Sequence, residues 1–393
     1  MTNSAQNAYR TRPAHIAFFT IPAHGHINPT LGLITELVNR GHRVSYAVTE
    51  PFADQVAEAG ATPVRYDSML PGSPNASRQE WPSEGTEARW MFLEETRSVV
   101  PQLEEAFAGD RPDLVVYDLG DFLVLAEKWG VPALQLCPTH VYTEGLESVL
   151  DLTPTPETTA VEEAYDEYFA EQGVALTNHD LLHPRRCIVT IPRSFQYFGD
   201  QAADSYAFVG PMLTERASQG SWQAPDDRPV LVISLGSAYN DRLDFYRRCL
   251  VAFADLDWHV VLAVGTAIDP AELGAVPANF EVHRWIPQLR MLSQASAFIT
   301  HAGMGGTMEG LSHGVPLIAV PQAADQFMNA ARIEELGLGV QLDGATATPE
   351  QLRVALEKVT SDEGIRNRLA DMRREIEGAG GLARAVEIVE GML

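Results

Sequence analysis

The stretch HIAFFTIPAHGHINPTLGLITELVNRGHRVSYAVT, residues 15–49, decides the fold class of the chain. It begins with an apolar run over 15–21 that is typical of a buried strand, and it ends with a second β-branched run over 43–49. Between the two runs, apolar residues at helical spacing predict a helix over 28–40 that Gly41 closes. A strand, a helix and a strand in this order predict a βαβ unit with parallel strands.

The same alternation continues along both halves of the chain. In the first half we expect further strands and helices at 52–60, 62–67, 88–108, 113–118, 120–129, 133–137 and 187–192. In the second half we expect strands at 229–235, 259–265, 280–284, 297–300, 316–320 and 340–342, with helices such as 325–336 and 350–360 between them. The sequence therefore predicts an α/β fold with two doubly wound, Rossmann-like domains of strand order 3-2-1-4-5.

Composition places the boundary between these domains. The polar, turn-rich segment ERASQGSWQAPDDR at 215–228 reads as a linker, so we expect a first domain over 1–213 and a second over 226–375. A Gly-rich break precedes a last helix at about 376–393, which we expect to pack back on the first domain. The weakly periodic region 139–186 predicts helices and loops over the sheet edge.

Charge and cysteine content exclude several classes of partner and site. A net charge of −25 argues against nucleic acid or an anionic membrane as the partner. It is compatible with a cationic acceptor, although the solubility of the protein or the composition of its host explains an acidic chain better. Residues 1–12 are polar and no apolar run is long enough to span a membrane, so we expect a cytoplasmic protein. Cys137, Cys187 and Cys249 are far apart and are expected to be reduced and mostly buried.

The strand order predicts an acid–base pair in the first domain. In a doubly wound sheet, the carboxyl ends of strands 1 and 4 are neighbours, and ligands bind beside them. Strand 1 runs into His24 and His26, and strand 4 ends at Asp118. We therefore expect Asp118 to bind one ring nitrogen of His26, so that the other nitrogen can accept a proton.

Other roles for these residues stay open at this stage. A histidine at a helix mouth can simply cap the helix, and an aspartate after a strand can cap the next one. His24 could be the active histidine instead of His26. The two histidines could also bind a metal ion, but no third ligand follows at a useful spacing.

The second domain carries two loops suited to an anion. Its strands 1 and 4 lead into SLGS, which ends at Ser237, and into HAGMGGT over 301–307. Glycines allow close approach of the backbone, and a helix that begins near Gly303 offers N–H groups and the positive end of its dipole. The chain has no G-x-x-x-x-G-K-[ST] motif, and the first domain has no G-x-G-x-x-G motif for a dinucleotide. We expect a diphosphate site here.

Further side chains near this site suit a nucleoside and a sugar. Trp285 follows strand 3 and could stack on a base, although a tryptophan is more often part of a core. Glu309 could bind ribose hydroxyls, or it could lie on a solvated helix face. Asp325 and Gln326 follow strand 5 and suit sugar hydroxyls, with a helix N-cap as the alternative for Asp325.

Taken together, these motifs resemble a known signature. WIPQ at 285–288, HAGMGGTMEG at 301–310 and GVPLIAVPQAADQ at 314–326 resemble the nucleotide-sugar signature of the UDP-glycosyltransferase family, which has the GT-B fold. The stretch HIAFFTIPAHGHINP at 15–29 is similar to its bacterial macrolide branch, above all to the antibiotic-inactivating enzymes of actinomycetes. The resemblance covers nearly the whole chain after residue 13.

The resemblance implies two facing domains with a cleft between them, and a role for each matching residue. His26 would be the catalytic base, with Asp118 as its partner. The nucleotide-sugar residues would be Ser237, Trp285, Ile286, Gln288, His301, Gly303, Gly305, Gly306, Thr307, Glu309, Asp325 and Gln326. The plant version of the signature has Trp, Asn and Ser where this chain has Met304, Gly305 and Gly306, which makes the choice between uridine and thymidine sugars less secure.

The implied reaction is transfer of glucose from UDP-glucose, with inversion, to a hydroxyl of a macrolide antibiotic that bears an amino sugar. No metal or cofactor is expected, because UDP-glucose is itself the substrate and the D-x-D at 255–257 lies in a turn away from both sites. Inactivation of the macrolide would protect a producer. The alternatives are a UDP-sugar 2-epimerase, transfer to another lipophilic product such as a flavonoid, and a non-catalytic binder.

The acceptor is expected between the domains, near segments 69–81 and 139–142 and the insertion 145–200. The apolar and aromatic content of these segments suits a large hydrophobic molecule. The residues expected to line the acceptor site are Met69, Trp81, Thr139 and Tyr142. A monomer and a homodimer are both compatible with the sequence.

Overall fold

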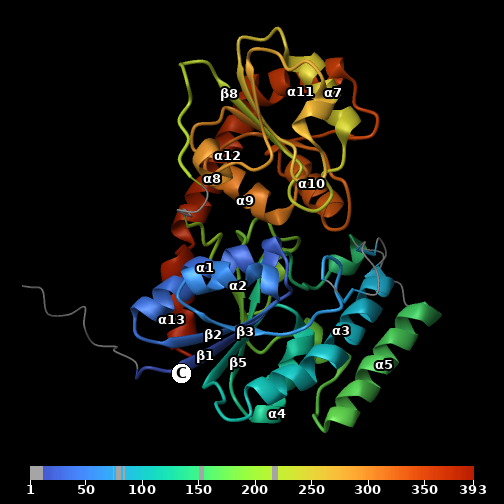
Figure 1. The fold of residues 1–393 in the computed structure, drawn as a ribbon, viewed down its shortest axis with the longest axis vertical. Coiled ribbons are helices and arrows are strands. Elements are labelled where there is room, and N and C mark those ends of the chain that lie inside the picture. The colour runs from blue at the N-terminus through green and yellow to red at the C-terminus, as the bar shows by residue number, and fades with distance from the viewer. Residues whose placement is uncertain (1–11, 74, 77–80, 83–84, 150–154, 215–219) are drawn as a thin grey trace, which may run out of the picture. The chain divides into compact units, whose positions relative to one another are not determined.

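The chain forms two compact α/β units, each built around one parallel sheet (Figure 1). The structure, a computed structural model, describes residues 12–73, 75–76, 81–82, 85–149, 155–214 and 220–393. The first unit comprises the chain up to Thr190 together with Phe198–Met212 and Gly380–Leu393. The second unit comprises Ile191–Tyr197 and Leu213–Ala379.

The first unit contains a seven-stranded sheet of order β3-β2-β1-β4-β5-β6-β7, all parallel. Its strands are β1 His15–Phe19, β2 Arg43–Val48, β3 Thr62–Arg65, β4 Leu114–Tyr117, β5 Ala133–Cys137, β6 Cys187–Val189 and β7 Tyr206–Phe208. Its helices are α1 His24–Asn39, α2 Glu50–Glu58, α3 Gly85–Ala106, α4 Leu123–Trp129, α5 Pro156–Gln172, α6 Asn178–Leu182 and α13 Gly381–Glu390. The predicted strand order is confirmed.

The start of α1 differs from the prediction. The helix begins at His24 rather than at residue 28, so both histidines lie in its first turn. Pro29 therefore lies inside the helix and gives up one hydrogen bond.

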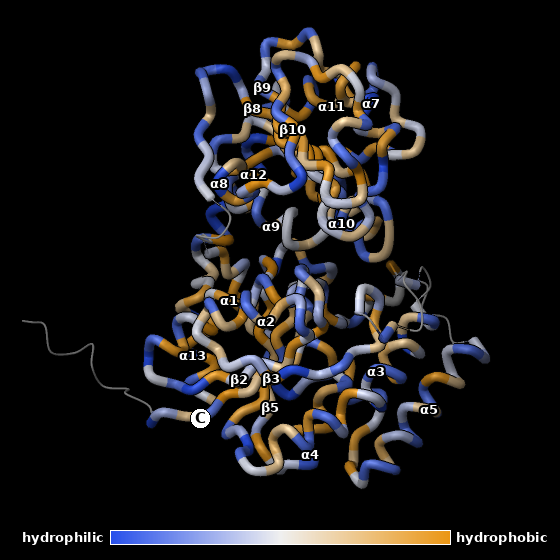
Figure 2. Tube along the Cα trace, viewed as in Figure 1, coloured by the Kyte–Doolittle hydropathy of each residue, from blue (hydrophilic) through white to orange (hydrophobic). Residues whose placement is uncertain are grey.

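Helices cover both faces of the first sheet with separate apolar cores. On one face, Ile16, Phe18 and Val116 pack with residues of α1, α2 and α13. On the other face, Phe19 and Val115 pack with residues of α3, α4 and α5. Helix α5 was expected over the sheet edge, but Tyr165 and Phe169 and their neighbours make it part of this second core. Figure 2 shows the hydrophobic residues concentrated along the strands.

The last helix, α13, belongs to the first unit. Val386 and Val389 are fully buried in the core beside α1, and Arg40 Nη1 donates to Glu390 Oε2 at 2.9 Å. Gly380, with φ of 93°, makes the break before the helix. The boundary of the unit therefore lies at 380, four residues after the start that the sequence predicted.

The second unit contains a six-stranded parallel sheet of order β10-β9-β8-β11-β12-β13. Its strands are β8 Val230–Ser234, β9 His259–Ala263, β10 Phe280–His283, β11 Ala297–Thr300, β12 Leu317–Ala319 and β13 Gly339–Gln341. Its helices are α7 Leu243–Phe253, α8 Gln288–Leu292, α9 Met304–Ser312, α10 Gln326–Glu335, α11 Pro349–Ser361 and α12 Glu363–Gly378. This order again places the first and fourth strands of the unit side by side, as predicted.

Residues 191–197 lie in the second unit, although the sequence assigned them to the first domain. Arg332 of α10 donates to the carbonyl groups of Ser194, Phe195 and Gln196. Its guanidinium also lies 4.7 Å from the centre of the Tyr197 ring. Ser194 N–H also donates to Glu375 at 2.9 Å, and Tyr197 O–H donates to the Met328 carbonyl at 3.1 Å. These contacts attach the segment to the unit, and no sequence pattern indicates them. The expected linker 215–228 begins with residues 215–219, outside the described residues.

The three cysteines and the lengths of the helices agree with the sequence analysis. Cys137, Cys187 and Cys249 are free and buried, as predicted. Within the described residues, no helix is long and apolar enough to cross a membrane.

We predict that Gly339→Ala destabilises the second unit. Gly339 pairs with Leu317 in the sheet, and a Cβ at this position would lie 2.0 Å from the carbonyl oxygen of Leu317. Overpacking of this kind typically costs about 1–3 kcal/mol. Thermal unfolding followed by circular dichroism should show a lower midpoint. Gly109→Ala, whose Cβ meets no atom within 4 Å, is the control; equal midpoints for the two variants would contradict the prediction.

Candidate active site

His26 and Asp118 form a hydrogen-bonded pair in the first unit. His26 Nδ1 lies 2.7 Å from Asp118 Oδ2. Strand β1 pairs with β4 so that Phe19 lies opposite Tyr117, which brings the loops that follow the two strands together. The pair joins residues 92 positions apart, and it lies where the strand order predicted it.

Backbone groups hold the Asp118 carboxylate in place. Its side chain is only 2% exposed, and Ile21 N–H donates to both carboxylate oxygens at 3.1 and 3.2 Å. Leu119 N–H donates to Oδ1 at 2.5 Å. The N-cap of the following helical turn is Leu119, so Asp118 does not serve as that cap. The carboxylate is oriented toward the imidazole instead.

The His26 ring is more accessible than its partner. Its side chain is 30% exposed, and the N-cap of α1 is Ala23, so His26 does not cap the helix. An ionised carboxylate only accepts hydrogen bonds, so Nδ1 carries the proton and Nε2 carries the basic lone pair. This is the arrangement of a general base whose imidazolium form is stabilised by a carboxylate.

His24 takes a different direction from His26. Its ring makes an edge-to-face contact with Phe52 of α2, at 4.9 Å between centroids. Within the described residues, no group of three or more His, Cys, Asp or Glu side chains is arranged to hold a metal ion. Asp255 of the D-x-D forms an ion pair with Arg353 of α11, far from the loops of the site in sequence.

An apolar cluster lies next to the His26–Asp118 pair. Its buried members are Ile21, Leu70 and Met91, and its partly buried members are Ala23, Trp81, Phe92 and Leu119. Ile21 and Leu119 are the residues whose N–H groups hold Asp118. Trp81, one of the predicted acceptor residues, packs against this cluster, and its ring lies 6.4 Å from that of Phe92. Of the predicted acceptor segments, residues 74, 77–80 and 150–154 lie outside the described residues.

The other predicted acceptor residues differ in their surroundings. Met69 N–H donates to the buried Glu95 carboxylate at 2.6 Å, which attaches the loop after β3 to α3. The Thr139 carbonyl accepts from Cys137 Sγ, and Tyr142 contacts the His183 ring at 5.0 Å. The placement of Thr139 and Tyr142 at an acceptor site stays a prediction.

In the second unit, the loops after β8 and β11 lie side by side. Thr300 pairs with Ser234, so the loop with Gly236 and Ser237 adjoins the loop with His301. Helix α9 begins next to them, with Gly303 as its N-cap and Met304 as its first residue. The first N–H groups of a helix have no partner within it. Because Thr307 N–H already donates to the Gly303 carbonyl, the helical groups suited to an anion are those of 304–306, and the N–H of the N-cap Gly303 directly precedes them.

His301 lies between two glycines. A Cβ on Gly236 would lie 2.5 Å from His301 Nε2, and a Cβ on Gly303 would lie 2.3 Å from the same atom. The requirement for glycine at both positions is therefore steric. Burial lowers the pKa of His301 to about 4, so the ring is neutral at pH 7 and can donate one N–H without carrying a charge.

The residues predicted to bind a nucleoside follow β10. Trp285 is 57% exposed, so it is not a core residue and its indole can stack on a base. The neighbouring Ile286 is half-buried. Gln288 Nε2 donates to Glu309 Oε2 at 2.7 Å, which joins α8 to α9 and orients the carboxylate. Glu309 is half-buried rather than on a solvated face.

The residues predicted to bind the sugar behave differently from one another. Asp325 is exposed and is the N-cap of α10, but its side chain does not cap the helix. Its Oδ2 accepts from Asn329 Nδ2 at 3.0 Å. Gln326 is buried, and its Oε1 accepts from the N–H groups of Gln322 and Ala323. The Oε1 of Gln326 therefore stabilises the loop before α10, and a contact of Gln326 with sugar hydroxyls stays a prediction.

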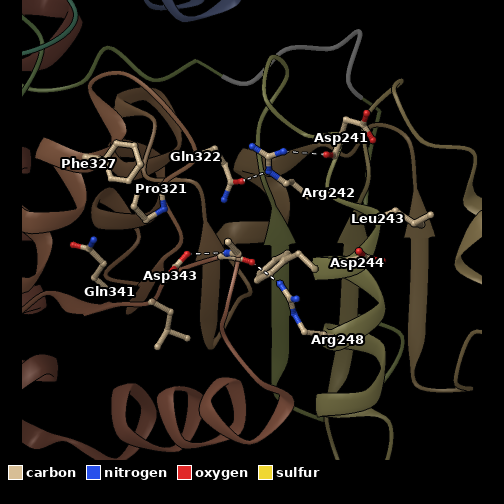
Figure 3. Close-up of a pocket in the computed structure, with 14 residues that line it drawn as sticks. Asp241, Arg242, Leu243, Asp244, Arg248, Pro321, Gln322, Phe327, Gln341 and Asp343 are labelled. Carbon is tan, nitrogen blue, oxygen red and sulfur yellow. Dashed lines mark hydrogen bonds between the residues drawn. The ribbon is translucent and has the colours of Figure 1, made fainter. Parts of the chain in front are cut away.

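A cavity of about 740 Å³ lies beside this loop (Figure 3). The residues of its wall follow β8, β12 and β13, and they include Arg242, Gln322, Phe327 and Asp343. Arg242 Nε donates to Gln322 Oε1 at 2.6 Å across it. None of the predicted nucleotide-sugar residues lines the cavity, so the expected donor site is not this hollow.

The sequence analysis missed two buried amides that brace the loops. Asn240 Nδ2 donates to the Gly236 carbonyl at 2.8 Å, and a Cβ on Gly265 would lie 2.1 Å from the same nitrogen. Asn329 Nδ2 donates to the Ala302 carbonyl at 2.9 Å. The spacing of Asn329, four residues after Asp325, was the one signal in the sequence that could have indicated a contact between them.

Comparisons with known proteins agree with this architecture. The model of the family "Erythromycin biosynthesis protein CIII-like, C-terminal domain" matches residues 247–390. The chain is 43% identical to oleandomycin glycosyltransferase of Streptomyces antibioticus, over 98% of this chain and 92% of that protein. It is 40% identical to NDP-glycosyltransferase YjiC of Bacillus licheniformis, over 96% of this chain and 98% of that protein. The solved structure of the glycotransferase of kitacinnamycin is 40% identical and covers 98% of this chain and 100% of its own, with a TM-score of 0.86.

We predict that His301 makes stability depend on pH between about 6.5 and 4. The folded pKa lies below the ordinary value of 6.5, so on acidification the unfolded chain binds a proton here before the folded chain does. The contribution of His301 is complete above pH 6.5 and is lost as the pH falls toward 4. Thermal unfolding at several pH values between 7 and 4.5 should show a steeper fall for the wild type than for His301→Gln. Parallel curves for the two proteins would contradict this.

Proposed function

We propose a reaction for this chain, which belongs to the bacterial macrolide branch of the UDP-glycosyltransferase family of GT-B enzymes. In this reaction, it transfers glucose from UDP-glucose to a hydroxyl of a macrolide. The family makes the protein a glycosyltransferase. The donor, the acceptor and the stereochemistry are our proposal. The hydrogen bond between His26 Nδ1 and Asp118 Oδ2 is the observation that carries it, because a reaction at a hydroxyl needs a base.

In the proposed reaction the first unit activates the acceptor. Nε2 of His26 takes the proton of the acceptor hydroxyl while the oxygen attacks the anomeric carbon. The imidazolium that forms is stabilised by Asp118, whose carboxylate is already held by Ile21 and Leu119. General base catalysis of this type contributes about 10²–10⁴ in rate.

The second unit holds the donor and its leaving group. The bond between the anomeric carbon and UDP breaks as the new bond forms on the opposite face, so the α-linked sugar becomes β-linked. The N–H groups at the start of α9 and the neutral His301 donate to the diphosphate as its charge develops. Trp285 stacks on uracil, Glu309 binds the ribose, and Asp325 binds the sugar. No metal or cofactor enters this scheme.

The choice of acceptor rests on the relatives and on the apolar cluster beside the base. The relative that is 43% identical is named for its action on oleandomycin. The partly buried members of the cluster, which include Trp81 and Phe92, are the ones that can offer apolar surface to a large lipophilic ring. We propose that glucosylation inactivates a macrolide and protects the cell, with other lipophilic products such as flavonoids as further acceptors.

We predict that His26→Ala abolishes transfer and leaves UDP binding nearly intact. The base is in the first unit and the residues proposed for the nucleotide are in the second, so the loss should be confined to turnover, by about 10²–10⁴-fold. Mass spectrometry of a macrolide incubated with UDP-glucose should show one added hexose for the wild type only. Titration calorimetry with UDP gives the binding control, and retained turnover in His26→Ala would refute the role of His26.

The same assay separates the alternatives. A 2-epimerase would convert UDP-glucose to an isomer without an acceptor, and a non-catalytic binder would retain both substrates unchanged. Because another relative is named an NDP-glycosyltransferase, UDP-galactose and dTDP-glucose are included beside UDP-glucose. We expect a hexosylated macrolide as the product and no isomer of the donor alone; an isomer without acceptor would favour the epimerase.

A further inference from the structure

Asn329 of α10 joins two loops of the candidate donor site through one amide group. The side chain is fully buried. Its Nδ2 donates to the Ala302 carbonyl at 2.9 Å and to Asp325 Oδ2 at 3.0 Å. Ala302 belongs to the turn proposed for the diphosphate, and Asp325 is proposed to bind the sugar. Both hydrogens of the amide are thus used on two loops that would act on neighbouring parts of one substrate.

The chemistry of the partners leaves one orientation for this amide. A backbone carbonyl accepts only, and an ionised carboxylate accepts only. The NH₂ group must therefore face them, since the flipped amide would bring its oxygen against two acceptors. The other atom, Asn329 Oδ1, is buried and has no hydrogen-bond partner in the described part of the chain.

The contact with Ala302 directs the neighbouring peptide. Ala302 is fully buried and has a φ of 60°, in the left-handed region that non-glycine residues rarely adopt. Its N–H donates to Thr300 Oγ1 at 3.2 Å and its carbonyl accepts from Asn329, so the turn is held at both ends. In a planar trans peptide, the C=O and the next N–H point in opposite directions. When the Ala302 carbonyl points inward to Asn329, the Gly303 N–H points away from the interior.

The contact with Asp325 fixes the second loop. Asp325 is exposed, yet its Oδ2 is turned toward the buried amide. The backbone contributes as well, because Asn329 N–H donates to the Asp325 carbonyl at 2.9 Å. The start of α10 and the turn before α9 therefore share one fixed point.

We propose that Asn329 is a positioning residue for the sugar nucleotide: it aims the Gly303 N–H at the diphosphate and the Asp325 carboxylate at the sugar, and keeps the two in register. The inference rests on the proposed function, since it assumes that a nucleoside diphosphate sugar occupies these loops. Asn329 does not touch the substrate itself. Its effect passes through Ala302 and Asp325.

Asn279 provides a matched control in the same unit. It is also a buried asparagine, and its Nδ2 donates to the carbonyl groups of Phe253, Leu256 and Trp258. Its Oδ1 likewise has no partner among the described residues. It stands directly before β10, at the edge of the sheet opposite to the carboxyl ends of the strands. Loss of this amide should affect stability without affecting the donor loops.

The experiment compares Asn329→Ala and Asn329→Asp with Asn279→Ala in the full chain. Titration calorimetry measures the affinity for UDP and UDP-glucose, kinetics with a macrolide give KM and kcat for UDP-glucose, and thermal unfolding reports the fold of each variant. We expect both Asn329 variants to lose about tenfold in UDP affinity. We expect them to lose about 10²-fold in kcat/KM, because a small misplacement of reacting groups has that effect. Asn279→Ala should lower only the unfolding midpoint.

A second comparison measures the contribution of the sugar to binding. The gain in affinity from UDP to UDP-glucose should shrink in Asn329→Ala, and it should not shrink further when Asn329→Ala is added to Asp325→Ala. Asn329 variants that lower the midpoint but keep the KM, kcat and UDP affinity of Asn279→Ala would overturn the inference. A wild-type protein that binds neither UDP nor dTDP would overturn the proposed function, and the inference with it.

Discussion

The pairing of β1 with β4 in the first unit, and of β8 with β11 in the second, brings together loops that are far apart in the sequence. In each sheet the winding reverses between these two strands, so no helix crosses over the gap between their carboxyl ends. The open gap holds His26 and Asp118 in one unit and His301 beside the start of α9 in the other.

The two gaps handle charge in different ways. In the first unit, a buried carboxylate held by backbone N–H groups orients an accessible imidazole and stabilises its protonated form. In the second unit, the groups that we propose for the diphosphate are the N–H groups at the start of α9 and a neutral histidine. Fixed dipoles do not have to reorganise when charge develops on a leaving group, which suits them to transition-state stabilisation.

Buried polar side chains account for the precision of the loops. Asn240 braces the Gly236 loop, Asn329 braces Ala302, and Glu95 holds the loop after β3. Each of these groups loses hydration on burial, and Asn329 retains one atom without a partner among the described residues. The glycines beside them are required for a complementary reason, since Gly236, Gly265 and Gly303 leave no room for a Cβ next to the groups they contact.

The sequence by itself determined the two parallel sheets, their strand order and the partnership of His26 with Asp118, because the period of apolar residues fixes element types and parallel winding fixes which loops meet. It did not determine the start of α1 at His24, the place of residues 191–197 in the second unit, or the contacts of Asn240 and Asn329. A hydrogen bond from a single buried amide produces no repeating pattern in the sequence. A helix that contains Pro29 forms because tertiary packing stabilises its first turns. Only the tertiary structure decides such contacts, because their energy comes from neighbours that are distant in the chain.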